Sequence, residues 1–411
     1  MLAQDQRQFI VTACRGCGAA GLAARRRWGD LPVCNQFGSL QPERFEMGLA
    51  QCDACGLVQL SEGPRAELLV PRLDWIKYRE PEAHLDSVCE QLMLTDRAEG
   101  LSAWGVGPFD RPLLERLAEK GAYVRQLDLV GPLANRESQT FPYLETLQGL
   151  VRCHETPPAL EAASADLIVF RYVIEHCDDP LDALKALRRR LKPGGRLVIE
   201  APDSTQFLQR QDYSFLWEEH RSYFTPSTFQ YLLQRAGLLV ETWHAFPGEL
   251  ESAMVAVCRA ISEDQSLDGR VTSLDPTEAQ TFERFCDGFS QVSGIWREIV
   301  RSARREGGVA LLGAGHQSLT FANVMGLTND IDVVIDDDPL KQECTAPGFV
   351  TRIAPSDAIL TRPDVRLCLV GLRPSLQPTL EARFPEFVAR GGRFLSIARS
   401  PERMTSSRGA A

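Results

Sequence analysis

The 411-residue sequence contains no run of about 18 apolar residues, the length that a membrane-spanning helix requires. Its first ten residues, Met1–Ile10, are polar and have no apolar stretch of the kind found in secretory signal peptides. Positive charge is also scarce, because 45 lysines and arginines stand against 55 aspartates and glutamates, a formal net charge of -10. Most of such a surface would repel a phosphate backbone. We therefore expect a cytoplasmic protein that binds neither nucleic acid nor membrane.

Twelve cysteines are present, but a disulfide framework is not expected in a reducing compartment. Four of them form two Cys-x-x-Cys pairs, Cys14/Cys17 and Cys52/Cys55, each followed by glycine. Each pair puts two thiolates on one tight turn, and two such turns supply the four sulfur ligands that structural Zn²⁺ prefers. A redox dithiol or an iron–sulfur cluster is the alternative, although a redox motif usually appears as a single pair beside a βαβ unit. We predict one structural zinc ion, which stabilises folding and does no chemistry.

Short apolar runs alternate with helical patterns from about residue 101 to 258, and again after a long predicted helix at Thr277–Glu306. Strand–helix alternation predicts an α/β fold, a parallel sheet with helices on both faces. The expected strands are Leu101–Val106, Tyr123–Leu127, Leu167–Phe170, Leu197–Ile199 and Met254–Val257 in the first block, and Val309–Leu312, Val333–Ile335, Leu367–Val370 and Phe394–Ile397 in the second.

The first strand of the larger block ends in the turn Gly105-Val106-Gly107. Glycines at a strand-to-helix turn let a ligand approach the backbone beside the N-terminus of the helix. Asp128 follows Gly107 by 21 residues, at the end of the next strand, where a carboxylate can accept hydrogen bonds from ribose hydroxyls. The alternative is that Asp128 only ends a strand. The pattern predicts a site for a nucleotide cofactor.

Two further segments carry a more specific signal. Ala165–Pro180 reads as a buried strand, a ligand-facing loop and the start of a helix, and Leu191–Pro202 as a Lys-Pro-Gly-Gly turn before another buried strand. This order resembles the fourth and fifth strands of class I S-adenosylmethionine-dependent methyltransferases, which have a Rossmann-like fold. The resemblance implies a cofactor site whose residues, with Asp110 as the acidic group at the amino-acid end of the cofactor, are Gly105, Gly107, Asp110, Asp128, Arg171 and His176.

The segment Phe215–Thr225, which reads Phe-Leu-Trp-Glu-Glu-His-Arg-Ser-Tyr-Phe-Thr, narrows the resemblance. It is similar to the Tyr-His-Glu-His-x-x-Tyr-Phe-Ser block of bacterial nucleotide-sugar C-methyltransferases. That family also has an N-terminal four-cysteine zinc-binding module and a C-terminal Rossmann-like domain, which Gly313-Ala314-Gly315-His316 and Asp336-Asp337-Asp338-Pro339 fit here. The resemblance implies methyl transfer from S-adenosylmethionine to a carbon of a keto-deoxysugar nucleotide or a related natural-product intermediate. Trp217 and Glu218 replace a Tyr and a His of the block, so the sugar need not be the same.

Methylation of carbon requires a base that removes a C–H proton beside a carbonyl group. By position, Glu219 and His220 match the Glu-His pair to which the family's deprotonation is assigned. An imidazole can act as this base, and a neighbouring carboxylate can orient it. The alternative is an aromatic packing corner in which His220 is hydrogen-bonded for structure. His176 is expected to border the cleft without being the base.

The resemblance divides the chain into a zinc-binding module (1–75), a methyltransferase domain (76–260), a helical linker (261–306) and a C-terminal Rossmann-like domain (307–411). The last domain is expected either to hold the nucleotide part of the substrate or to serve as a scaffold. Three other functions stay open: an O- or N-methyltransferase acting on another small metabolite, a binding protein with a degenerate cofactor site, and an oxidoreductase that uses the Gly313 turn for a nicotinamide.

Overall fold

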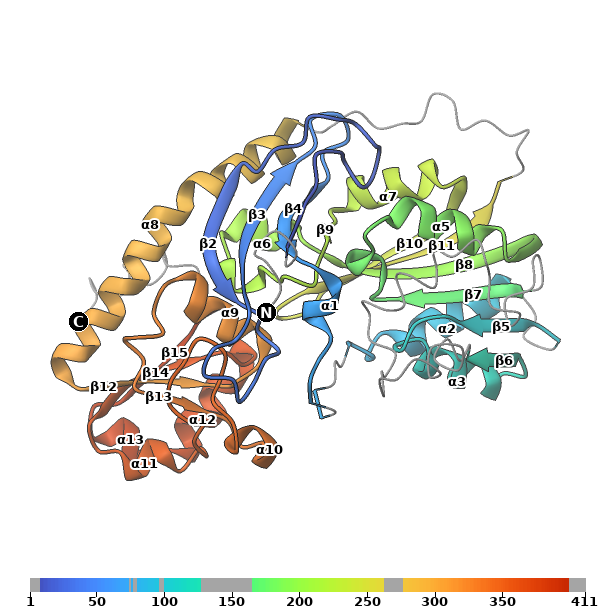
Figure 1. The fold of residues 1–411 in the computed structure, drawn as a ribbon. Coiled ribbons are helices and arrows are strands. Elements are labelled where there is room, and N and C mark those ends of the chain that lie inside the picture. The colour runs from blue at the N-terminus through green and yellow to red at the C-terminus, as the bar shows by residue number, and fades with distance from the viewer. Residues whose placement is uncertain are drawn as a thin grey trace.

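The structure is a computed structural model, and it describes residues 8–73, 75–76, 80–95, 100–126, 165–261 and 276–398. These residues form three sheets, one N-terminal, one central and one C-terminal, and the long helix α8 (Pro276–Glu306) lies beside the first and the third, as Figure 1 shows. Within the described part of the chain, no helix is both long and apolar enough to cross a membrane.

The N-terminal sheet is antiparallel and has the order β1-β4-β3-β2. A short strand from the central part of the chain, β9 (Ser222–Tyr223), pairs with the outer edge of β4, where Gln59 lies opposite Ser222. The segment that follows His220 is therefore part of the N-terminal sheet. The four N-terminal strands are β1 (Gln8–Ile10), β2 (Arg26–Pro32), β3 (Arg44–Gln51) and β4 (Val58–Pro64), followed by α1 (Ala66–Leu69).

The central sheet has the order β10-β11-β8-β7-β5-β6. Strands β6, β5, β7 and β8 run parallel, and β11 is antiparallel to both of its neighbours. The parallel strands end at one edge, which brings the glycine turn after β5 close to the loop after β7. The strands are β5 (Ser102–Gly105), β6 (Tyr123–Gln126), β7 (Ala165–Arg171), β8 (Leu191–Asp203), β10 (Leu238–Phe246) and β11 (Ser252–Ala260); the helices are α2 (Leu85–Thr95), α3 (Arg111–Glu119), η2 (Ile174–His176), α5 (Pro180–Arg188), α6 (Thr205–Arg210), η3 (Tyr213–Phe215) and α7 (Pro226–Arg235).

The C-terminal sheet is parallel and has the order β13-β12-β14-β15. Its glycine turn, Gly313–Gly315, lies between β12 and α9, at the end of the first strand. The strands are β12 (Gly308–Leu312), β13 (Val333–Ile335), β14 (Val365–Val370) and β15 (Arg393–Ser396); the helices are α9 (His316–Val324), α10 (Pro339–Gln342), α11 (Ala358–Thr361), η4 (Pro374–Leu376), α12 (Gln377–Arg383) and α13 (Pro385–Ala389).

Helix α8 does more than link two domains. Its Phe285 and Phe289 rings lie against Trp28 of β2, with centroid separations of 6.1 and 6.2 Å. Two turns further along the same helix, Trp296 meets Phe321 of α9 edge to face, with the ring centroids 4.9 Å apart. All five side chains belong to one continuous buried cluster. The helix therefore supplies a core that the N-terminal and C-terminal sheets share, and Figure 1 shows it passing along both.

Candidate active site

The four cysteines of the two Cys-x-x-Cys pairs converge on one point of the N-terminal sheet, with their Sγ atoms all within 4.8 Å of one another. Cys14 Sγ lies 3.5 Å from Cys55 Sγ, and Cys17 Sγ lies 3.6 Å from Cys52 Sγ. A tetrahedral zinc site with Zn–S bonds of about 2.3 Å has sulfurs roughly 3.8 Å apart. The donor set and its spacing therefore fit a closed four-sulfur zinc site.

Both cysteine turns are held by their own backbone. Gly18 donates to the carbonyl of Cys14, and Gly56 donates to the carbonyl of Cys52, each at 2.8 Å. The two glycines have φ values of +77° and +76°, a left-handed conformation that a side chain would strain. The amide of Gln59 then ties the first turn to β4, because its Nε2 donates to Cys14 Sγ at 3.2 Å.

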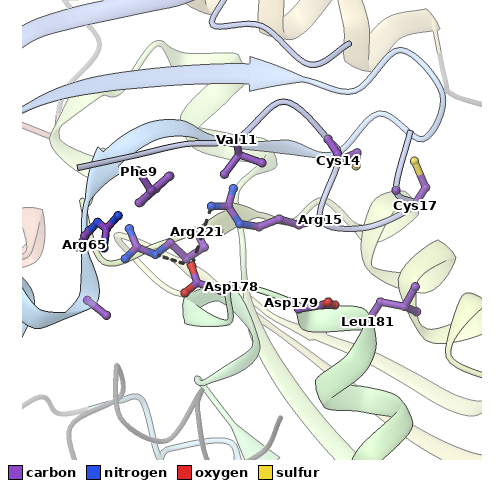
Figure 2. A pocket seen from close by; sticks show the side chains of 13 residues that line it. Phe9, Val11, Cys14, Arg15, Cys17, Arg65, Asp178, Asp179, Leu181 and Arg221 are labelled. Carbon is purple, nitrogen blue, oxygen red and sulfur yellow. Dashed lines mark ion pairs between the residues drawn. The ribbon is translucent and has the colours of Figure 1, made fainter. Parts of the chain in front are cut away.

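An arginine within the first cysteine turn reaches the central sheet. Arg15 and Arg221 both approach the carboxylate of Asp178, at 4.0 and 3.3 Å, beneath the ring of Phe9 (Figure 2). Asp178 closely follows η2, and Arg221 follows His220 in the chain. The four-cysteine cluster is thus connected, through one ion-pair network, to the segments that carry His176 and His220.

The glycine turn after β5 is closed by Asp110. Its Oδ2 accepts hydrogen bonds from the backbone N–H groups of Val106 and Gly107, at 2.7 and 2.6 Å, and its Oδ1 accepts one from Arg171 at 2.8 Å. Burial raises the pKa of this carboxyl group to about 7. A Cβ atom on Gly105 would lie 2.9 Å from Cβ of Asp110, so a side chain here would displace the residue that closes the turn.

Arg171 at the end of β7 is engaged within the protein. It is 1% exposed, and its guanidinium pairs with Glu200 and donates to the carbonyls of Phe109 and Pro81. The second carboxylate oxygen of Glu200 lies 2.7 Å from Nε2 of His84. These contacts join the glycine turn, β7, β8 and the residues before α2 at one edge of the sheet.

We expect Glu200→Gln to lower the free energy of unfolding by about 3–5 kcal/mol, because it leaves the buried Arg171 guanidinium without its counter-charge. Denaturant unfolding at neutral pH measures this. The matched control is Glu241→Gln, whose exposed pairs with Arg196 and Arg259 predict a change within about 1 kcal/mol. Equal losses in the two variants would contradict a special role for the buried pair.

His220 lines a cavity of about 310 Å³ between the central and C-terminal sheets. Its ring lies edge to face with the ring of His176, with centroids 4.8 Å apart, and both imidazoles are buried. Burial, with the nearby His176 and His316, holds the pKa of His220 well below its usual range, and burial lowers that of His176 to about 3. Both rings are therefore neutral at pH 7. The residues that line this first cavity are Glu80, Tyr172, Glu175, Phe215, Trp217, His220, Glu251, Gly315, His316, Gln317 and Gly371.

A second cavity, of about 390 Å³, lies on the other side of Trp217 and His316. These two rings stack with centroids 4.3 Å apart and line both cavities. The N-terminal, central and C-terminal parts of the chain all contribute residues to the wall of the second cavity. These residues are Cys34, Asn35, Phe37, Trp75, Ile76, Trp217, Glu219, Ala314, Gly315, His316, Asp338 and Lys341.

Two protein-family models match this chain, one in its central part and one in its C-terminal part. A family model described as a methyltransferase domain matches residues 86–242. A second model, described as a C-methyltransferase C-terminal domain, matches residues 265–397. The central part of the chain therefore has the fold of a class I methyltransferase domain. The predicted S-adenosylmethionine-dependent methyltransferase fold is thereby confirmed, with its parallel sheet and glycine turn.

Among curated proteins, the C-methyltransferase NovU of Streptomyces niveus is 26% identical over 252 residues, 56% of this chain. The match spans only 56% of the length of that relative. Among solved structures, the 1,6-didemethyltoxoflavin-N1-methyltransferase of Burkholderia thailandensis is 18% identical over 44% of this chain and 80% of its own, with a TM-score of 0.32. The magnesium protoporphyrin IX methyltransferase of Synechocystis is 14% identical over 45% of this chain and 90% of its own, with a TM-score of 0.31.

The methyltransferase domain does not place the predicted Glu219–His220 pair together as expected. The carboxylate of Glu219 lines the second cavity, and its Oε1 lies 3.4 Å from Nδ2 of Asn35, whereas His220 lines the first. Adjacent residues here have side chains that face different cavities. The carboxyl group that lies with the imidazoles of His176 and His220, all within 4.8 Å, belongs to Glu175.

The predicted cofactor residues fall into two groups. Gly105, Gly107, Asp110 and Arg171 meet at the edge of the methyltransferase sheet, but the polar atoms of Asp110 and Arg171 are occupied by internal hydrogen bonds. Their direct contact with a cofactor stays a prediction, and the geometry gives them a positioning role. His176, the last residue of η2, lies beside His220. Asp128 lies outside the described residues, two positions after β6 ends.

Several cavity residues were not predicted from the sequence. The sequence motifs assign His176 to the cleft but not its neighbour Glu175, which is as deeply buried, at 1% exposed. The unusual feature of Tyr172 is its backbone φ of +50°, which only the structure reveals. Glu80, Glu251 and His316 come from parts of the chain remote from the methyltransferase motifs, and no spacing rule links them to His220.

Proposed function

We propose that this protein is an S-adenosylmethionine-dependent C-methyltransferase that acts on a carbon next to a carbonyl group. The observation that carries the proposal is the neutral, buried imidazole of His220, which lines a cavity between the methyltransferase domain and the C-terminal domain. The match of residues 265–397 to a C-methyltransferase C-terminal domain and the similarity to the C-methyltransferase NovU support it.

The cofactor site is assigned to the edge of the sheet at the glycine turn. Gly107 presents a surface without a side chain, and a Cβ there would lie 2.8 Å from Val173, so the turn packs directly on the loop after β7. Asp110 and Arg171 fix these two segments relative to one another. When bound, S-adenosylmethionine supplies an electrophilic methyl group, and the protein's own contribution is to hold the acceptor carbon in line with it.

The acceptor is assigned to the two cavities. His220, in the first cavity, would take the proton from the acceptor carbon. The second cavity provides Asn35, Glu219 and Lys341 beside the glycine turn Gly313–Gly315, which suits a polar, hydroxyl-rich group. A keto-deoxysugar nucleotide or a related natural-product intermediate combines these two requirements, and we propose this class as the substrate.

The four-cysteine cluster would hold one zinc ion. All four ligand positions are filled by protein sulfur, so the ion would stabilise the N-terminal sheet and would not take part in the reaction.

Methyl transfer tests the proposal directly. Purified protein with its metal is incubated with methyl-labelled S-adenosylmethionine and a nucleoside diphosphate 4-keto-6-deoxyhexose, and the product is analysed by carbon NMR. We expect the label on a carbon adjacent to the carbonyl group. Label on oxygen or nitrogen would support an O- or N-methyltransferase instead, and failure to bind S-adenosylhomocysteine in calorimetry would support a non-catalytic binding protein.

We expect Asp128→Ala to weaken binding of S-adenosylhomocysteine by roughly 1.5–3 kcal/mol, since hydrogen bonds from ribose hydroxyls to a charged carboxylate would be lost. Calorimetric titration measures the change. The control is Asp166→Ala, because Asp166 pairs with Lys192 at the start of β7, away from the glycine turn. An unchanged affinity in Asp128→Ala would place the ribose elsewhere.

A further inference from the structure

The turn that follows β7 contributes two polar side chains to the wall of the first cavity. Tyr172 and Glu175 both line this cavity, and the residues between them lead into η2. Tyr172 has a φ of +50°, a conformation that costs a residue with a side chain roughly 1–3 kcal/mol and that is concentrated at functional sites. The strained backbone is held by the hydrogen bond from Tyr172 N–H to the carbonyl of Glu200, at 3.0 Å.

Both groups are buried, and part of their hydrogen-bonding capacity is unused. Glu175 is 1% exposed and Tyr172 is 2% exposed. Within the described ranges, neither Oε2 of Glu175 nor the hydroxyl of Tyr172 has a hydrogen-bond partner. Such a buried group costs about 1–3 kcal/mol of stability, and most buried polar groups in proteins are paired. Two unused groups in one cavity wall point to a ligand that supplies the missing partner.

The surroundings keep both groups in their protonated forms. Burial raises the pKa of Glu175 well above its usual range, with the nearby carboxyls of Glu80 and Glu251 adding to the effect, and burial likewise raises the pKa of Tyr172. Burial also raises the pKa of Glu80 to about 7 and that of Glu251 well above its usual range. The other titratable residues that line this cavity are His220 and His316.

We propose that the carboxylic acid of Glu175 and the hydroxyl of Tyr172 form an oxyanion hole, which binds the carbonyl oxygen of the acceptor and stabilises the enolate formed there. This inference rests on the proposed C-methyltransferase function and deepens it. It makes Glu175 and Tyr172 catalytic residues, which bind the carbonyl oxygen that the proposed acceptor carries beside its acidic carbon.

The geometry combines the two groups that an enolisation needs. His220, on the same cavity wall, takes the proton as the C–H bond breaks, and the electron pair of that bond moves onto the carbonyl oxygen. Glu175 and Tyr172 donate hydrogen bonds to this oxygen as its charge develops. A carboxylic acid kept neutral by burial is a stronger donor than water in this position. The enolate carbon then bonds to the methyl group as the bond between that methyl and the sulfonium sulfur breaks, its electron pair leaves with S-adenosylhomocysteine, the carbonyl re-forms, and the proton leaves His220 to solvent.

A phenolate probe tests the oxyanion hole without any acceptor. We expect the wild-type protein to bind 4-nitrophenol in its phenolate form, detected by the visible absorbance of the phenolate at pH 7. Glu175→Leu should bind it about 10- to 100-fold more weakly, because a hydrogen bond to a charged group is lost. Glu175→Gln, whose amide still donates, should retain part of the affinity, and Tyr172→Phe should lose a comparable amount. Glu241→Gln, a carboxylate on β10 outside the cavity, is the matched control.

The acceptor assay separates this inference from the proposed function. With a nucleoside diphosphate 4-keto-6-deoxyhexose in deuterated water, Glu175→Leu should lower both methyl transfer and deuterium exchange at the acidic carbon by about 10²–10³-fold. Affinity for S-adenosylhomocysteine and the melting temperature of Glu175→Gln should stay close to wild type. Equal phenolate affinity in all variants, or no phenolate binding by the wild type, overturns the oxyanion hole. Phenolate binding without any methyl transfer by the wild type overturns the C-methyltransferase function and leaves the anion site established.

Discussion

Replacement of His220 by alanine is expected to lower the rate of methyl transfer by about 10²–10⁴-fold, the usual contribution of general base catalysis. The imidazole is buried, and its depressed pKa keeps it neutral, with a ring nitrogen that can accept a proton, throughout the usual titration range of histidine and below it. Binding of S-adenosylhomocysteine should be unchanged, because the glycine turn lies at a different part of the domain. Deuterium exchange at the acidic carbon of the acceptor should fall with the rate, even without the methyl donor.

A purely structural role for His220 predicts a different set of results. The melting temperature would fall, but exchange per folded molecule would survive. His244→Ala is the matched control, because His244 lies on β10 and is not among the residues that line either cavity. If exchange in the folded fraction of His220→Ala equals that of the control, the base is another group of the cavity.

The same variant should change the response of stability to acid. His176 has a folded-state pKa of about 3, and that of His220 is also depressed, whereas an unfolded histidine titrates near 6.5. Between these values the unfolded chain binds protons that the folded chain does not. The free energy of unfolding therefore rises with pH in this window and reaches its full value above about pH 6.5. His220→Ala should make this rise less steep, as denaturant midpoints at pH 5 and pH 7 will report.

Removal of the metal is the second change for which we expect a large effect. The protein should copurify with one zinc ion per chain, and a chelator or Cys14→Ser should lower both the zinc content and the melting temperature, because the binding free energy of a structural metal is part of the folding free energy. Affinity of the central domain for S-adenosylhomocysteine should stay near its original value. Metal analysis, calorimetric titration and thermal unfolding provide the readouts.

Cys344→Ser is the control, since this cysteine lies in the C-terminal domain away from the cluster and should leave the zinc content unchanged. A preparation that is free of metal and fully stable would contradict the zinc assignment. The Arg15–Asp178–Arg221 network adds an expectation: loss of zinc should also lower methyl transfer, because Arg15 lies within the cysteine turn and Arg221 is adjacent to His220.

Much of the fold follows from hydrophobic patterning. The buried strands β5, β7, β11, β12 and β14 contain continuous apolar runs, and their positions were predicted within a few residues. Strand β10 was missed, because its residues alternate between partly buried and exposed positions and form no apolar run. The segment interpreted as a helical linker contributes large aromatic side chains to a core, and only contacts remote in sequence reveal this.

The candidate site also has a part that the sequence predicts and a part that it does not. The cysteine cluster was predictable because its four ligands lie in two short motifs, and the structure brings all four together. The carboxylate near His220 could not be predicted in this way. The candidates were Glu175, Glu218 and Glu219, and the one that faces His220 is determined by how two separate segments pack. Glu218, for example, accepts a hydrogen bond from Cys34 N–H at 2.7 Å and faces the N-terminal sheet. A sequence motif specifies which residues are adjacent in the chain, and the direction of each side chain depends on its neighbours in space.

The shared core along α8 has a consequence for synthesis on the ribosome. Trp28 of β2 leaves the ribosome about 250 residues before Phe285, so at roughly 5–20 residues per second the apolar face of the N-terminal sheet waits roughly 10 to 50 s for its partner helix. During that interval Trp28, Phe45 and Met47 lack the α8 side chains that complete their cluster. A nascent chain stalled before residue 276 should therefore recruit chaperones, whereas one stalled beyond residue 306 with α8 outside the exit tunnel should release them.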